Sequence, residues 1–144
     1  MDRLRLVAQA AIPFVWFGMV VAISLIEAPL KFRAPGITRA LGLGIGRLVF
    51  RALNVAELTL FLLLALALVG AGAGAVRWTL VAVTGAVLLT QAFVMRPLLD
   101  VRAQQIIAGG QPVASHLHVV YIAMEAIKLV TVAWLGISLV LRLR

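Results

Sequence analysis

The stretch LHVVYIAMEAIKLVTVAWLGISLVL, residues 117–141, is long enough to cross a bilayer as a helix, yet it carries Glu125 and Lys128. A membrane-spanning helix needs about 20 mainly apolar residues. Charged groups at bilayer depth are costly and usually face the inside of a bundle, where each has a partner. The stretch therefore predicts a spanning helix with one polar face that is packed against other helices.

The rest of the chain offers partners for this helix. Hydrophobic residues make up 64% of the 144 residues and charged residues only 12%, with a mean hydropathy of +1.14. Soluble domains are about 45–50% apolar. We therefore predict an all-α integral membrane four-helix bundle, with one domain over residues 1–144 and spans at about 6–28, 47–69, 78–99 and 115–141. Residues 37–46 fit either a short interfacial helix or the start of a long second span.

The first apolar run follows Arg3 and Arg5, as a cleaved signal sequence would. It is longer than the roughly 7–15 apolar residues of a signal core, and no clear cleavage site follows it. We therefore expect it to remain as the first span. The protein is then a multi-pass protein of the cell membrane, with both termini on one side. The loops after spans one and three lie on the other side, called here the loop side, which we predict to be cytoplasmic.

The formal charge is +8, from 13 basic and 5 acidic residues. The basic residues lie mainly at span ends, where they meet anionic lipid head groups, so we expect the lipid bilayer as a partner and no nucleic acid. The absence of cysteine excludes disulfides, thiolate metal sites and thiol nucleophiles. The two histidines, His116 and His118, point apart on a helix and cannot chelate one metal together. We predict no cofactor and no metal site.

Polar residues follow one face of span two and one face of span four. With about 100° per helical residue, each set falls within an arc of roughly 120° or less. Lipid would leave these groups unsatisfied, so we expect the two faces to turn toward each other across the bundle. The sets are Arg47, Arg51, Asn54 and Glu57 on span two, and His118, Tyr121, Glu125 and Lys128 on span four.

Glu27 and Gln91 add polar groups to the last turns of spans one and three. All these groups then lie in the loop-side half of the bilayer or near its midplane, which argues against a channel within one chain. The pattern predicts a blind vestibule that opens on the loop side. Its lining residues would be Arg47, Arg51, Asn54, Glu57, His118, Tyr121, Glu125, Lys128, Glu27 and Gln91. Two interpretations remain: an ion-pair network that fixes the helices, or a binding site for a small anion or an amphiphile.

Three short motifs resemble a family of small four-span proteins related to transmembrane protein 205. They are Ala28-Pro29-x-x-Phe32 at the end of span one, Gly46-Arg47-x-x-Phe50 entering span two, and Leu117-His118 entering span four. The resemblance implies a four-helix membrane fold. On the eukaryotic side of the family it implies a loose link to drug resistance and secretion, with no assigned chemistry.

The segment Arg51-Ala52-Leu53-Asn54-Val55-Ala56-Glu57 resembles a motif of the membrane-associated eicosanoid and glutathione metabolism family. The Asn-x-x-Glu spacing is the same, whereas the arginine stands one residue closer. The resemblance implies glutathione bound between the protomers of a trimer. Three classes of function stay open: ligand binding or transport as a homo-oligomer, a membrane enzyme with His118 as the first candidate base, and an accessory subunit of a membrane complex.

Overall fold

A computed structural model describes residues 3–142, and within that range the chain is helical without any strand. The first span runs through α1 (Arg3–Val20), a π-helical segment η1 (Val21–Glu27), α2 (Ala28–Leu30) and a 3-10 turn η2 (Lys31–Arg33). The second is α3 (Arg39–Leu68). The third combines α4 (Ala75–Thr90), a π-helical segment η3 (Gln91–Met95) and α5 (Arg96–Ile107), and the fourth is α6 (Leu117–Arg142). Four helices of this length and hydropathy are able to cross a membrane, so the predicted all-α four-helix bundle is confirmed.

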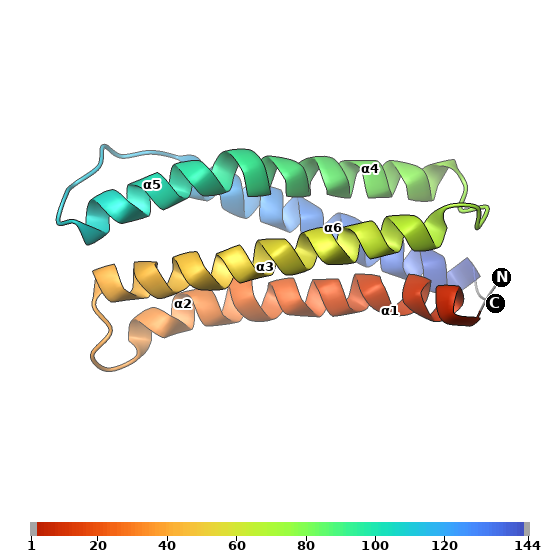
Figure 1. The fold of residues 1–144 in the computed structure, drawn as a ribbon, viewed down its shortest axis with the longest axis horizontal. Helices are drawn as coiled ribbons and strands as arrows, with labels where there is room; N and C mark the ends of the chain where they lie inside the picture. The colour runs from red at the N-terminus through yellow and green to blue at the C-terminus, as the bar shows by residue number, and fades with distance from the viewer. Residues whose placement is uncertain (1–2, 143–144) are drawn as a thin grey trace.

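The spans run up and down along the long axis of the molecule (Figure 1). The start of α1 and the end of α6 lie near the same end, and the connections 34–38 and 108–116 lie at the other, which is the loop side. The first span packs against both α3 and α6, and the third span also packs against these two helices. Each span therefore has two neighbours around a common axis, and all four can place side chains there.

Apolar residues cover the outside of this bundle, and several of its most buried residues are charged or polar. Leu48 is 70% exposed, Phe93 66% and Trp134 62%, whereas Glu57 is 0% and Lys128 1% exposed. A soluble protein would bury the first group and expose the second. The arrangement is that of a multi-pass membrane protein whose apolar surface faces lipid.

The second and third spans extend farther toward the loop side than the sequence predicts. α3 begins at Arg39, where the Thr38 side chain accepts a hydrogen bond from the Leu41 amide at 3.2 Å, so residues 39–46 belong to the long span. Glycine there allows close packing, because a Cβ added to Gly42 would clash with the ring of Phe32. Both spans exceed the roughly 20 residues that cross the hydrocarbon. Several turns of each therefore project beyond it.

The two π-helical segments each lie immediately before a proline-containing turn. The Ala28 amide donates to the Ile23 carbonyl, and the Arg96 amide donates to the Gln91 carbonyl, five residues back in both cases. Proline lacks an amide hydrogen and its ring clashes with the carbonyl four residues back, so Pro29 and Pro97 favour a local widening of the helix. These segments were not predicted from the sequence.

Arginines close the opposite end of the bundle. Arg5 donates to the carbonyl of Val69, Arg142 donates to that of Ala71, and Arg77 donates to that of Ser138 at 2.7 Å. These carbonyls belong to the turn after α3 and to the last turns of α6. Basic side chains that satisfy such carbonyls are typical of a membrane surface, so the end of α3 at Leu68 marks one boundary of the hydrocarbon.

Candidate functional site

The two polar faces meet, as predicted, in a buried ion-pair network. Lys128 Nζ lies 2.6 Å from Glu57 Oε1 and 2.9 Å from Glu125 Oε2. The three residues are at most 3% exposed. The network therefore joins α3 to α6 at a depth where neither water nor lipid head groups can replace the partners.

Neutral donors add to this network, because two carboxylates share one ammonium, while Glu57 Oε2 and Gln91 Oε1 have no hydrogen-bond partner among the described residues. Trp16 Nε1 donates to Glu57 at 2.8 Å, Ser24 Oγ donates to Glu125 at 2.7 Å, and Gln91 Nε2 donates to Glu125 at 2.8 Å. All four spans thus contribute a side chain. Ser24 and Gln91 both belong to the π-helical segments, which place them on the inner face of spans one and three.

Two members of the network, Trp16 and Ser24, were not predicted from the sequence. A signal for Trp16 was present, since a tryptophan in the middle of a span, away from the interfaces where this residue is usual, needs a partner for its indole N–H. Glu57, Lys128 and Gln91 line neither of the two cavities described below, although the predicted vestibule included them. Their geometry fits the structural interpretation, in which paired polar groups hold the helices in register.

A central cavity of about 870 Å³ opens between the four spans on the loop side of this network. Apolar residues of spans one and four line the part nearest the network, among them Leu25, Ala126 and Leu129, and Leu25 is 54% exposed. Glu125 borders it, but its oxygens are already engaged by Lys128, Ser24 and Gln91. Predicted site residues that line this cavity are Arg47, His118, Tyr121 and Glu125.

Basic side chains outnumber acidic ones around the central cavity. Lys31, Arg39, Arg47, Arg96 and Arg102 line it, against Asp100 and Glu125. Asp100 forms ion pairs with two of these cations, Arg96 at 3.3 Å and Arg47 at 3.7 Å. Lys31 pairs with Glu27 at 3.2 Å, which places Glu27 beside the cavity and not among its lining residues. Arg39 is exposed and has no ion-pair partner within residues 3–142.

Tyr121 lines the central cavity as a buried residue whose polar group has no partner. It is 5% exposed, its ring packs edge-on against Phe50 with centroids 6.3 Å apart, and its hydroxyl makes no hydrogen bond within the described residues. A buried hydroxyl without a partner is costly. The unpaired hydroxyl therefore belongs to a residue of the cavity lining.

His118 lies on the first turn of α6, is exposed, and lines the cavity near its mouth. No group of three or more histidine, cysteine or acidic residues gathers as a metal site in the part of the chain that the structure describes.

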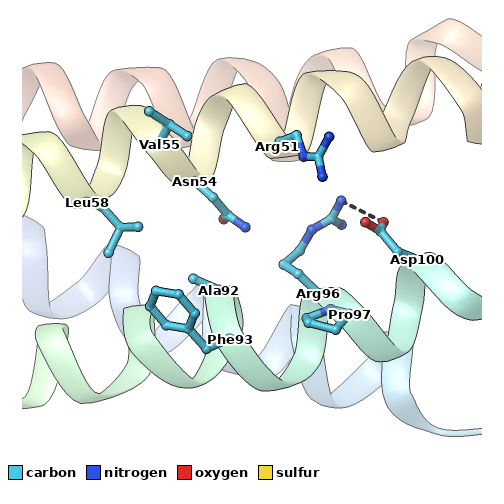
Figure 2. Close-up of a pocket in the computed structure, with 9 residues that line it drawn as sticks. All are labelled: Arg51, Asn54, Val55, Leu58, Ala92, Phe93, Arg96, Pro97 and Asp100. Carbon is cyan, nitrogen blue, oxygen red and sulfur yellow. Dashed lines mark hydrogen bonds and ion pairs between the residues drawn. The ribbon is translucent and has the colours of Figure 1, made fainter.

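A second, smaller pocket of about 360 Å³ lies between α3 and the η3–α5 part of the third span (Figure 2). Arg51 and Asn54 reach into it from α3, so the structure places these two predicted site residues here and not in the central cavity. Arg96 and Asp100 line both spaces. The polar residues that were predicted to line one vestibule are therefore divided among the buried network, the central cavity and this lateral pocket.

Comparison of the chain with protein-family models, with curated proteins and with solved structures gives no match.

Proposed function

We propose that the protein binds a small amphipathic molecule in the central cavity, with an anionic head near the basic residues and an apolar part toward the inner walls. The observation that carries this proposal is the buried hydroxyl of Tyr121, which belongs to a residue of the cavity lining and lacks a partner within the described residues. The buried network lies next to the inner end of the cavity and contributes Ser24 and Glu125 to its lining.

The charge distribution supports an anionic head. Five basic and two acidic side chains of the described residues line the cavity, and one of the acids, Glu125, is already paired with Lys128. Asp100 is shared between two arginines, so their charge is only partly compensated. Guanidinium groups bind carboxylates and phosphates with short, charge-assisted hydrogen bonds.

The depth of the lining residues supports an apolar tail. α6 runs inward from the loop side, so Tyr121 precedes Ile122, Ala126 and Leu129, which lie progressively deeper. Leu25 faces this inner region from the first span. A pocket that is polar at its mouth and apolar at depth fits a molecule with the same division.

Native mass spectrometry of the protein extracted in a neutral detergent tests the proposal. We expect an anionic amphiphile to co-purify with the wild-type protein and to be lost from the Tyr121→Phe variant. Dodecyl phosphate added to delipidated protein should restore the complex, whereas dodecyl maltoside should not. Equal binding of the two compounds would contradict the proposed anionic head site.

A further inference from the structure

The lateral pocket has its own polar groups and its own opening. Arg51 and Arg96 extend toward each other across it from neighbouring spans (Figure 2). Arg51 is exposed and makes no ion pair or hydrogen bond within residues 3–142. The Asn54 Oδ1 atom, one turn deeper on α3, is buried and also lacks a partner among the described residues. The pocket thus holds two guanidinium groups and an amide with unused hydrogen-bonding capacity.

The rim of this pocket faces lipid. Val55 is 61% exposed and Phe93 66% exposed, and both line it. The hydrocarbon is crossed by roughly 20 helical residues, and counting that length back from Leu68 reaches the region of Arg51. Arg51 therefore lies at the outer edge of the hydrocarbon, where a long basic side chain extends to the head groups, and the pocket opens sideways there.

An ion pair stands between the lateral pocket and the central cavity. Arg96 and Asp100 line both, and their side chains are joined at 3.3 Å. Arg47, which of these two spaces lines only the central cavity, contacts the same Asp100 oxygen, Oδ1, at 3.7 Å. An anion that binds Arg96 competes with Asp100, and Asp100 still has Arg47 as a partner when Arg96 leaves it.

We propose that the lateral pocket binds the phosphate of an anionic lipid between Arg51 and Arg96, and that this is how the amphiphile of the central cavity enters from the bilayer. This inference rests on the function proposed for the central cavity. In the bound state Arg96 turns from Asp100 to the phosphate, and Asp100 pairs with Arg47 alone. The Asn54 carbonyl accepts a hydrogen bond from a hydroxyl or ammonium group of the same head group.

Binding of dodecyl phosphate to purified protein in a neutral detergent tests this inference. We expect Arg51→Gln to weaken the binding of dodecyl phosphate in the lateral pocket at least tenfold, since it removes one of the two charge-assisted contacts there. Asn54→Leu should weaken binding less. Arg33→Gln is the matched control, because Arg33 is also exposed and lacks an ion-pair partner within the described residues but lines neither space. Inorganic phosphate, measured in parallel, separates a lipid head group from a free anion.

The outcomes separate the two proposals. If Arg51→Gln binds dodecyl phosphate like the wild type while Tyr121→Phe does not, the lateral site is wrong and the central cavity stands. If neither variant weakens binding, both proposals are wrong. If inorganic phosphate binds as tightly as dodecyl phosphate and also depends on Arg51, the ligand is a free anion and the lipid route is overturned. Loss of affinity in Arg51→Gln with Arg33→Gln unchanged supports the inference.

Discussion

Lys128 Nζ lies 2.6 Å from Glu57 Oε1, and this pair joins the second and fourth spans with almost no exposure of either side chain. Breaking a buried ion pair leaves an uncompensated charge, which costs about 3–5 kcal/mol. We therefore expect Lys128→Met to lower the melting temperature in detergent strongly. Arg51→Gln, which removes a cation without a partner in the described residues, should melt like the wild type. Equal melting temperatures of the Lys128→Met and Arg51→Gln variants would contradict the structural role of the network.

Trp16 gives a second test of the same network. Trp16→Phe removes the donor at 2.8 Å from Glu57 and leaves the carboxylate with one partner fewer, at a cost of about 1–3 kcal/mol. The matched control is Trp134→Phe, since Trp134 is 62% exposed. We expect a lower melting temperature for the first variant only. A similar fall in both would mean that the indole hydrogen bond contributes nothing specific.

Close packing between spans two and three depends on Gly85. A Cβ at this position would lie 2.6 Å from the Phe61 ring, so Gly85→Ala forces the helices apart or the ring aside, at about 1–3 kcal/mol. Gly18→Ala is the control, because nothing lies within 4 Å of a Cβ there. The melting temperature should fall for Gly85→Ala and should stay level or rise for Gly18→Ala. It should recover when Gly85→Ala is combined with Phe61→Leu. Failure of that rescue would argue against the Phe61 contact as the cause.

Tyr121→Phe separates binding from stability. The hydroxyl has no partner within the described residues, so its removal leaves no group unsatisfied and should not lower the melting temperature. Affinity for dodecyl phosphate should fall about tenfold, because the ligand loses a hydrogen bond to its charged head. The measurement is a pair of titration and melting curves on the same preparation. A destabilised variant with unchanged affinity would assign Tyr121 to the core instead of the site.

The fold could be predicted from the sequence because apolar length alone identifies a spanning helix. The loop-side ends of the spans were predicted less accurately. α3 and α5 continue beyond the hydrocarbon into a polar region, where hydropathy carries no signal. The meeting of the polar faces of spans two and four also followed from the sequence, because charges at that depth had to face inward.

The division of the polar residues into three places could not be predicted. Arg51 and Glu57 share one face of α3, but Arg51 lies nearer the membrane surface and turns to the third span, whereas Glu57 meets Lys128 in the interior. That difference depends on which helix is the neighbour at each depth. Hydropathy also carries no information on the widened turns before the two prolines, which bring Ser24 and Gln91 to Glu125.

A crystal structure grown from a lipid phase that contains dodecyl phosphate would show directly whether the central cavity binds an anionic amphiphile. We expect density for one alkyl phosphate in the cavity, with its head within hydrogen-bonding distance of the Tyr121 hydroxyl and its chain toward Leu129. A cavity filled only by water, with the Tyr121 hydroxyl bonded to protein and dodecyl phosphate present at saturating concentration, would contradict the proposal.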